Sequence, residues 1–249
     1  MLIQNKIRSK FLYPIERMIL NINYLLNNYK EVVWLLGDGR SGTTWVSNLI
    51  KEEKLYREMF ETFHPLLVDK FSFLLPHQYM RPEVSNERFK QFSSDVFSGK
   101  FTHPRVDFSN HSLVYKGLIL KDIFANLFAY WVSIRFPQIK IILLLRNPFS
   151  VAISKNRKKE WYWLTEPLNL LEQPDLYEDY LVPFADIIRD VSDDIDYITS
   201  QVLIWSIINY VPLRQFKPDK IHIVFYEDML INPNHEVAKI FRFLIPEYW

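Results

Sequence analysis

The stretch EVVWLLGDGRSGTTW, residues 31–45, decides the fold of this chain. Its first part, EVVWLL at 31–36, is a short apolar run with β-branched residues, typical of a buried strand, and it ends at Gly37. Apolar residues then recur at helical spacing between positions 45 and 50. The sequence therefore predicts a strand, a glycine-rich turn and a helix in direct succession.

Two other apolar runs have the same arrangement. The run IKIILLL at 139–145 and the run IHIVFY at 221–226 are each followed by an Asn-Pro pair, at 147–148 and 232–233. Such a pair suits the N-cap and first turn of a helix. We also expect weaker strands at 56–60 and 113–115, and helices at 120–135, 176–190 and 198–214. Strands that alternate with helices predict an α/β fold, with a central parallel β-sheet flanked by helices.

Composition limits the classes of function. With 249 residues, of which 49% are hydrophobic, the chain can bury a core, and we expect one domain over 1–249, with a helical extension at 1–30 and a catalytic core at 31–249. Thirty basic residues against 29 acidic ones leave a net charge of +1, so no overall field attracts DNA or an anionic membrane, and any anion site must be local. The absence of cysteine excludes thiol catalysis and Cys-ligated metals.

No signal-like apolar core or membrane-length apolar span occurs in the sequence. We therefore expect a cytoplasmic protein without a transmembrane segment and without a nucleic-acid partner. The sequence leaves the oligomeric state open.

The glycine-rich turn has the frame of a phosphate-binding loop. Residues 37–44, which we call the glycine loop, read GDGRSGTT, and small residues in a G-x-x-x-x-G frame let backbone N–H groups converge on an anion. Thr43 stands where a nucleotide hydrolase has its lysine, and Arg40 supplies a cation instead. Arg146 follows the strand at 139–145, where such a hydrolase often has a magnesium-binding Asp. Two cations and no evident metal ligand indicate a metal-free anion site.

These motifs resemble those of the sulfotransferases that use 3′-phosphoadenosine 5′-phosphosulfate (PAPS). The run RSGTTW at 40–45 is similar to the loop that binds the 5′-phosphosulfate in that family, and Arg146-Asn147-Pro148 with Ser154 is similar to its 3′-phosphate element. FYEDML at 225–230 is a weaker match to a motif near the family's C-terminus. The resemblance implies the following cofactor-binding residues: Arg40, Ser41, Gly42, Thr43, Thr44, Trp45, Arg146 and Ser154.

The resemblance also implies a fold and a reaction. We expect a sulfotransferase fold related to P-loop NTPases, without a metal. The reaction would transfer a sulfuryl group from PAPS to a hydroxyl or amine of an acceptor, such as a carbohydrate or another small molecule, with 3′-phosphoadenosine 5′-phosphate (PAP) as product. The rivals are a P-loop kinase or related phosphotransferase, and a nucleotide-binding protein of the same fold without catalysis.

The catalytic base has three candidates in the sequence. Glu61 lies 21 residues after Arg40, a spacing similar to that of the catalytic glutamate in tyrosylprotein sulfotransferases. A carboxylate at the end of a strand can take the proton of the acceptor. His64 competes because it is nearby, and His103, in a segment that faintly resembles the histidine motif of cytosolic members, is a further alternative. Trp45 either stacks on adenine or belongs to the core.

Three further expectations come from the same resemblance. Lys116 ends the expected strand at 113–115, where many members have a lysine that stabilises the transferring group, so we count Lys116 with Glu61 and Arg40 as catalytic. The aromatic run at 161–163 occupies the region of the acceptor loop. The basic segment by which cytosolic members hold the 3′-phosphate near their C-terminus is not found, so Arg157 or Lys158 is a candidate substitute.

Overall fold

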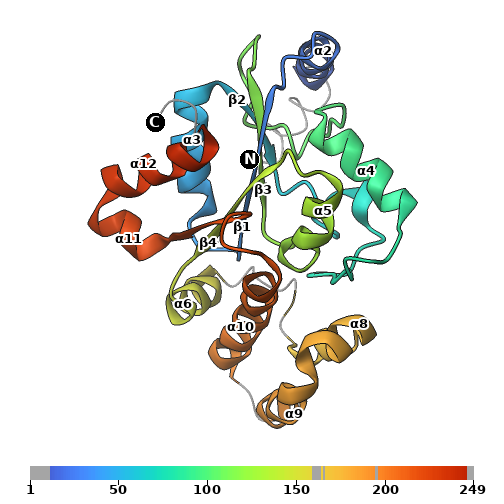
Figure 1. Ribbon diagram of the computed structural model, residues 1–249, viewed down its shortest axis with the longest axis vertical. Helices are drawn as coiled ribbons and strands as arrows, with labels where there is room; N and C mark the ends of the chain where they lie inside the picture. The colour runs from blue at the N-terminus through green and yellow to red at the C-terminus, as the bar shows by residue number, and fades with distance from the viewer. Residues whose placement is uncertain (1–11, 159–163, 165, 194–195, 246–249) are drawn as a thin grey trace.

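The computed structural model describes residues 12–158, 164, 166–193 and 196–245, and its centre is a parallel sheet of five strands in the order β2-β3-β1-β4-β5 (Figure 1). The strands are β1 (Glu31–Gly37), β2 (Tyr56–Phe60), β3 (Gly117–Asp122), β4 (Lys140–Leu145) and β5 (His222–Phe225). β1 lies in the middle and pairs with β3 on one side and β4 on the other. The glycine loop therefore follows the central strand, at the carboxyl edge of the sheet.

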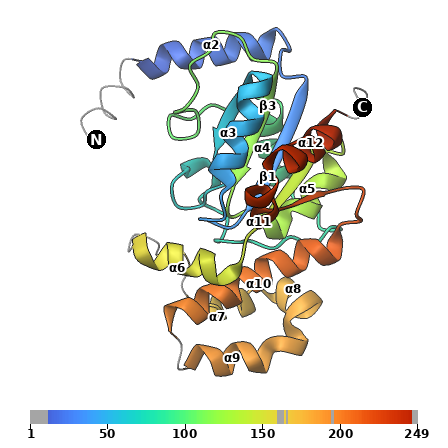
Figure 2. The same cartoon turned by 90° about the vertical axis from the view of Figure 1, so that its left-hand side faces the viewer.

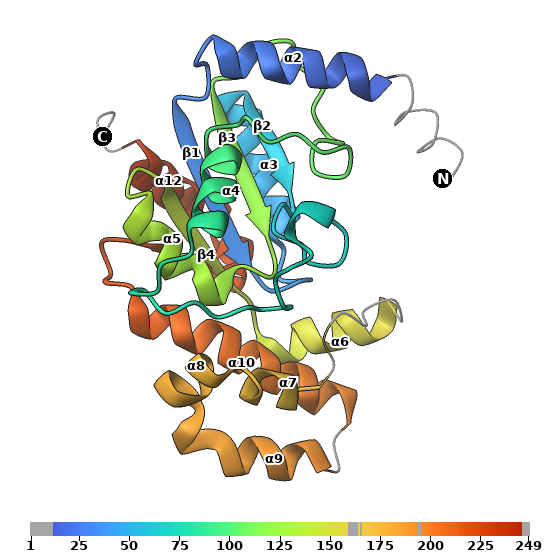
Figure 3. The same ribbon diagram turned by 90° about the vertical axis from the view of Figure 1, so that its right-hand side faces the viewer.

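Helices cover both faces of the sheet, as the apolar runs predict. On one face lie α3 (Thr43–Lys54), α11 (Tyr226–Ile231) and α12 (Pro233–Leu244); on the other lie α4 (Glu87–Phe97) and α5 (Ala129–Arg135) (Figures 1 and 3). Side chains of β1 alternate between the two cores: Val33 and Leu35 pack with the α3 and α12 side, and Trp34 and Leu36 pack with the α4 and α5 side. A strand that is buried on both faces explains the continuous apolar run in the sequence.

The two ends of the sheet carry different helices. α2 (Tyr13–Leu25) lies across the amino ends of the strands, whereas α6 (Pro148–Lys158) and α10 (Tyr197–Gln215) lie beyond their carboxyl ends (Figure 2). A third core holds α10 against the short helices α7 (Leu168–Leu171), α8 (Pro174–Leu176) and α9 (Ala185–Asp193). None of the helices in the described ranges is both long and apolar enough to cross a membrane.

The α/β fold class, the parallel sheet and the strands at 31–36, 56–60, 139–145 and 221–226 are confirmed, with small shifts of their ends. The helices expected after both Asn-Pro pairs and at 198–214 are also present, as α6, α12 and α10.

The expected strand at 113–115 is wrong, because the strand in this part of the chain begins two residues after that range. β3 begins at Gly117, where a Cβ would lie 2.5 Å from the ring of Tyr56 and 2.6 Å from the carbonyl oxygen of Glu31, so only a residue without a side chain fits there. Because β3 lies later than expected, the helix expected at 120–135 also starts later. Leu120 to Asp122 belong to β3, and α5 begins at Ala129.

The expected helix at 176–190 is interrupted. Residues 177–181 form a π-helical turn and residues 182–184 a 3₁₀ turn before α9 begins at Ala185. Pro183 lies in this interruption, where it has no N–H to donate to a continuing α-helix.

Candidate active site

The glycine loop connects β1 to α3 with a backbone that only its small residues permit. Gly42 has a φ of 102°, and a Cβ on it would lie 2.6 Å from the ring of Tyr226 at the start of α11. Ser41 tightens the turn, since both its backbone N–H and its hydroxyl donate to the carbonyl oxygen of Asp38, at 3.1 and 2.6 Å. The loop thereby leads directly into the N-terminus of α3 at Thr43, where unpaired N–H groups attract an anion.

Arg40 brings the two predicted anion motifs together. Its Nε donates to the hydroxyl of Ser154 on α6 at 3.2 Å, and its carbonyl oxygen accepts a hydrogen bond from Nη1 of Arg146 at 3.0 Å. Its backbone has a φ of 70°, a conformation that costs energy for a residue with a side chain. The loop after β1 and the helix after β4 are therefore adjacent parts of one site.

Arg146 follows β4 and is held by the ring of Tyr226, which lies 4.3 Å from the guanidinium carbon. This stacking leaves its Nε buried and without a hydrogen-bond partner among the described residues. The next residue, Asn147, accepts a hydrogen bond from the backbone N–H of Ser150 and so caps the start of α6. A buried donor without an acceptor is costly, and a bound anion would satisfy it.

A buried ion pair fixes the glycine loop against the helices beyond the sheet. Lys155 Nζ on α6 lies 2.7 Å from each carboxylate oxygen of Asp38 and 2.9 Å from Oε1 of Gln201 on α10. Asp38 and Lys155 are 2% exposed each. Nothing in the sequence indicates this pair, because a lysine inside an expected helix gives no signal of its partner.

A cavity of about 430 Å³ opens in front of the loop, at the low end of the range of about 300–1,000 Å³ that is common for small-molecule sites. It is lined by Gly39, Arg40, Gly42, Thr43, Thr44, Trp45, Phe60, Glu61, Lys121, Ile123 and Arg146. Trp45 is partly buried and packs edge-on against Tyr226, with ring centroids 5.7 Å apart. Both expectations for Trp45 are therefore compatible with its position: it contacts the core and also lines the cavity.

Glu61 lies at the carboxyl end of β2 and lines the cavity. Its Oε2 accepts a hydrogen bond from Nη2 of Arg105 at 2.6 Å, and its Oε1 lies 3.6 Å from Nζ of Lys121. Its φ of 47° is a second strained backbone at the site, next to a backbone hydrogen bond from its N–H to the carbonyl oxygen of Lys121. Both oxygens of the carboxylate thus have cationic neighbours.

Lys121, near the end of β3, lines the cavity and was not among the residues expected from the sequence. Its Nζ donates to the hydroxyl of Thr44 at 3.2 Å and lies 3.7 Å from the centre of the Phe60 ring. Burial lowers the pKa of Lys121, although neighbouring carboxylates, Glu61 first, act in the opposite direction. The signal was available: Leu118 to Leu120 is a short apolar run that ends in a charged residue, like the run that ends before Arg146.

Lys116 does not have the position expected of it. It is exposed and precedes β3, where its backbone N–H donates to the carbonyl oxygen of Leu55 and its carbonyl oxygen accepts from Lys30. The residue therefore lies at the amino edge of the sheet, at the opposite end from the glycine loop, and the expectation that it stabilises a transferring group is wrong. The wrong expectation for Lys116 follows from the strand expected at 113–115, which would have put this lysine at a carboxyl end.

The two histidines proposed as alternative bases do not line the cavity. His64 is buried against the ring of Phe124 and its Nδ1 accepts the backbone N–H of Leu66. Burial, together with Arg105, lowers the pKa of His64 to about 3. His103 lies on the loop before β3, where burial lowers its pKa and its Nδ1 accepts the backbone N–H of Arg105.

Some predicted residues lie outside this description. The aromatic run at 161–163 falls outside the described residues, as does the side chain of Lys158. Arg157 is exposed on α6 and is not among the residues that line the cavity. Within the described ranges, no group of three or more His, Asp or Glu side chains is arranged to hold a metal, and the expectation of a metal-free site stays a prediction.

Comparison with known proteins gives one family. The family model described as the sulfotransferase domain matches residues 30–246. No curated protein sequence matches the chain.

Solved structures resemble the chain at low identity. A sulfotransferase from Alicyclobacillus acidocaldarius is 13% identical, with 86% of this chain and 81% of that one covered and a TM-score of 0.46. Sulfotransferase STF1 from Mycobacterium tuberculosis is 11% identical, with 91% and 72% covered and a TM-score of 0.46. A mouse sulfotransferase complexed with PAP is 15% identical, with 88% and 61% covered and a TM-score of 0.40.

Proposed function

The chain belongs to the sulfotransferase family, and from that premise we propose that it transfers a sulfuryl group from PAPS to a hydroxyl or amine of an acceptor. The observation that carries the proposal is the contact between the two cationic motifs, in which Arg146 donates to the carbonyl oxygen of Arg40 and Arg40 donates to Ser154. PAPS has a phosphosulfate at one end and a separate phosphate at the other, so its binding requires two neighbouring anion sites. Cationic side chains at the ends of the adjacent strands β1 and β4 fit that requirement.

The residues fit the donor on their own chemistry. Arg40 and the N–H groups at the start of α3 would hold the phosphosulfate, and Arg146 with Ser154 would hold the 3′-phosphate. The buried and unpaired Nε of Arg146 supports this assignment, because an anion there would satisfy a donor that now has no acceptor among the described residues. The missing side chain at Gly42 leaves room for the ring of Tyr226, on which the Arg146 guanidinium stacks.

The chemistry needs positioning, neutralisation of charge and removal of one proton. When bound, PAPS supplies an activated sulfuryl group whose departure leaves PAP. Glu61 would accept the proton of the acceptor hydroxyl or amine, since it is the carboxylate that lines the cavity. Arg40 and Lys121 would stabilise the negative charge that develops, a role that needs fixed cations in a partly dehydrated site. Arg105 would orient the Glu61 carboxylate through the contact at 2.6 Å.

A kinase of related fold is the main rival. Thr43 occupies the position of the lysine that contacts the β- and γ-phosphates in P-loop NTPases, which argues against this rival. The second rival is a protein that binds the nucleotide without catalysis. In such a protein Glu61 would need no role beyond its partly buried ion pair with Arg105.

Ligand binding and turnover separate the three possibilities. PAP at 100 times its dissociation constant would stabilise the fold by about 2.7 kcal/mol. This raises the melting temperature by roughly 5–10 °C for a chain of this size. ATP with magnesium should have little effect. Tight magnesium-dependent binding of ATP in calorimetry contradicts the proposal in favour of the kinase. Binding of PAP without transfer from radiolabelled PAPS to any member of a varied library of hydroxyl and amine acceptors favours the non-catalytic protein.

A further inference from the structure

The helix α2 turns an apolar stripe to the solvent. Six large hydrophobic side chains on this side are each 46% or more exposed, and the first five recur every three or four positions. They are Leu12, which precedes the helix, Ile15, Met18, Ile22, Leu25, and Leu26, which follows the helix. At a rise of 1.5 Å per residue, this stripe is about 20 Å long. A surface helix of a globular protein normally turns such a stripe to the core, so the orientation of α2 needs an explanation.

The opposite side of α2 is fixed to the body of the protein by polar contacts. Asn23 is 1% exposed, and its side chain donates to the carbonyl oxygen of Leu113 and accepts the backbone N–H of Tyr115, both at 2.9 Å. Tyr29 donates to the carbonyl oxygen of Leu20 at 3.1 Å. These directional contacts determine the rotation of α2 about its axis, and they hold the apolar stripe away from the core.

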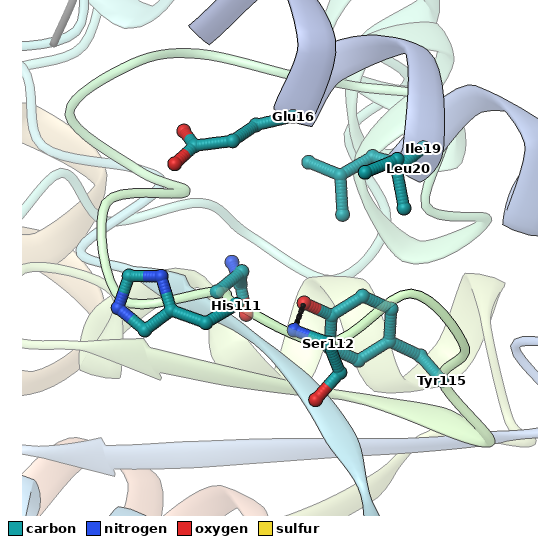
Figure 4. A pocket seen from close by; sticks show the side chains of 7 residues that line it. Glu16, Ile19, Leu20, His111, Ser112 and Tyr115 are labelled. Atoms are coloured by element: carbon teal, nitrogen blue, oxygen red, sulfur yellow. Dashed lines mark hydrogen bonds between the residues drawn. The ribbon is translucent and has the colours of Figure 1, made fainter. Parts of the chain in front are cut away.

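The view beneath α2 agrees with this orientation. Glu16, Ile19 and Leu20 point from the helix toward the segment at 111–115, across a cavity of about 170 Å³ (Figure 4). The segment below adds to the exposed apolar surface rather than covering it, because Leu113 and Val114 are 72% and 60% exposed. The stripe of α2, which we call the α2 surface, lies at the amino end of the sheet (Figure 2).

Basic residues outnumber acidic ones near the α2 surface. Five of the 30 basic residues of the chain and one of the 29 acidic residues lie within the first thirty positions, so the near-neutral total conceals a local excess of positive charge. Among the described residues, Arg17 and Lys30 are exposed on and just after α2, and the exposed Lys116 is joined to Lys30 by a backbone hydrogen bond. The acidic neighbours are Glu16 on α2 and Glu31, which accepts a hydrogen bond from the hydroxyl of Tyr56. An apolar stripe with a basic surround matches the interfacial region of a bilayer that contains anionic lipid.

We propose that the α2 surface lies on an anionic lipid bilayer, with Ile15, Met18, Ile22 and Leu25 among the acyl chains and Arg17, Lys30 and Lys116 near the headgroups. A second copy of the chain is a poorer occupant for two reasons. The stripe spans about two heptads, short of the three or four that a stable coiled coil needs. Pairing of two copies through α2 would also bring two basic segments together.

This docking leaves the cavity at the glycine loop facing away from the bilayer. α2 crosses the amino ends of the strands and the loop lies beyond their carboxyl ends (Figure 2). The proposal is therefore independent of the proposed sulfuryl transfer, and its test does not need activity.

Flotation with lipid vesicles tests the proposal. The full chain is mixed with vesicles of phosphatidylcholine alone or with about one-third phosphatidylglycerol, and we expect it to float with the anionic vesicles and much less with the neutral ones. The double substitution Ile22→Gln with Leu25→Gln should weaken binding to the anionic vesicles by roughly tenfold or more, since it removes two apolar side chains from the buried stripe. These side chains are exposed, so the melting temperature should be unchanged.

The matched control replaces apolar side chains that are equally exposed elsewhere. Ile187 on α9 and Ile231 on α11 are 59% and 82% exposed, and Ile187→Gln with Ile231→Gln should leave vesicle binding unchanged. Absence of flotation, or equal loss in the α2 and control variants, overturns the proposal. Sedimentation velocity is run on the same proteins: a dimer of the full chain that the α2 variant abolishes, without vesicle binding, assigns the surface to a second copy instead.

Discussion

Lys155 on α6 and Asp38 in the glycine loop form an ion pair in which Nζ lies 2.7 Å from both carboxylate oxygens and both side chains are almost fully buried. Oε1 of Gln201 on α10 also accepts a hydrogen bond from the ammonium group, at 2.9 Å. Through this pair the loop is attached to the two helices beyond the carboxyl edge of the sheet. The position of Arg40, two residues after Asp38, therefore depends on packing at α6 as well as on the turn itself.

Lys155→Met should be strongly destabilising, because it leaves the Asp38 carboxylate buried without its cation. Removal of one member of a buried pair costs about 3–5 kcal/mol, which urea unfolding would measure. Affinity for PAP should fall as well, since the loop loses its attachment. Lys217→Met, at an exposed position after α10, is the matched control and should cost less than about 0.5 kcal/mol. The double variant Asp38→Asn with Lys155→Met should recover part of the loss; if Lys155→Met alone costs under about 1 kcal/mol, the pair does not support the loop.

Arg146→Ala should weaken binding of PAP much more than binding of adenosine 5′-phosphosulfate, which has no 3′-phosphate. A hydrogen bond to a charged group contributes about 1.5–3 kcal/mol, so calorimetry should find a loss of roughly 10- to 150-fold for PAP alone. Arg214→Ala, at an exposed position on α10, serves as the control for removal of a positive charge. Equal losses for both ligands mean that Arg146 has a structural role through its stacking on Tyr226.

The fold could be predicted where the sequence signal was local. The run at 31–36, the glycines after it and the Asn-Pro pairs each specify a strand end or a helix start within a few residues, and the parallel sheet follows from their alternation. The signal failed around β3. Leu113 to Tyr115 is as β-like as Leu118 to Leu120. The start of β3 at Gly117 needs a missing side chain there because of the Tyr56 ring and the Glu31 carbonyl oxygen on the two neighbouring strands.

The candidate site divides in the same way. The residues of the glycine loop and Arg146 were identifiable because each lies beside a strand end in the sequence. Lys121 was not expected because β3 itself was misplaced. Arg105 was not expected because it lies on a loop without regular structure, 44 residues from Glu61, the residue that it contacts. Contacts of this kind depend on how the loops fold over the sheet edge, which no periodicity encodes.

Asp122, at the end of β3, should give the free energy of unfolding a distinctive pH dependence. Burial raises the pKa of Asp122 to about 7, from an ordinary value of 3.8. Between these two values the folded state keeps a proton that the unfolded chain releases, so this group makes stability fall as pH rises through that window. His64 and His77 act with the opposite sign, because burial lowers the pKa of each to about 3 and the unfolded chain binds their protons below about 6.5.

The difference between the chain and Asp122→Asn isolates the carboxyl group from the histidines. Asp122 now accepts hydrogen bonds from Nε1 of Trp34 at 2.8 Å on one oxygen and from the backbone N–H of Phe63 at 3.0 Å on the other. The amide has one oxygen and can keep only one of these bonds, so the variant also loses stability by an amount that does not depend on pH. Relative to the unsubstituted chain, the variant should gain stability as pH rises from about 4 to about 7 in chemical unfolding. A constant difference across this range would mean that Asp122 is ionised in the folded state throughout.

Lys121 and Lys116 form a natural test pair for the proposed reaction. Lys121→Met keeps the length of the side chain but removes the charge from the cavity, and turnover should fall by roughly 10²–10³-fold if the ammonium group stabilises developing charge. Lys116→Met removes the same charge at the amino edge of the sheet and should leave turnover unchanged. Single-turnover transfer from saturating PAPS is the measurement. Equal rates for Lys121→Met and Lys116→Met would remove Lys121 from the reaction.

Glu61→Gln tests the assignment of the base. The amide keeps the shape of the side chain but cannot take the acceptor's proton, so turnover at saturating PAPS should fall by roughly 10²–10⁴-fold while PAP affinity is retained. Glu61 also forms ion pairs with Arg105 and Lys121, so a purely structural role has to be distinguished. If the role is structural, Glu61→Gln should lower the melting temperature and reduce donor affinity and rate together.

The histidine variants supply the comparison that decides between these roles of Glu61. His64→Ala and His103→Ala should cost far less in rate, because neither imidazole lines the cavity and burial lowers the pKa of both. The pH profile adds an independent readout. An imidazole with a pKa near 3 is neutral throughout the physiological range, so a rate that depends on His64 would show no titration near pH 6.5. If Glu61→Gln keeps a near-normal rate while one histidine variant is inactive, the base is that histidine, and the assignment of the donor site to Arg40 and Arg146 is unaffected.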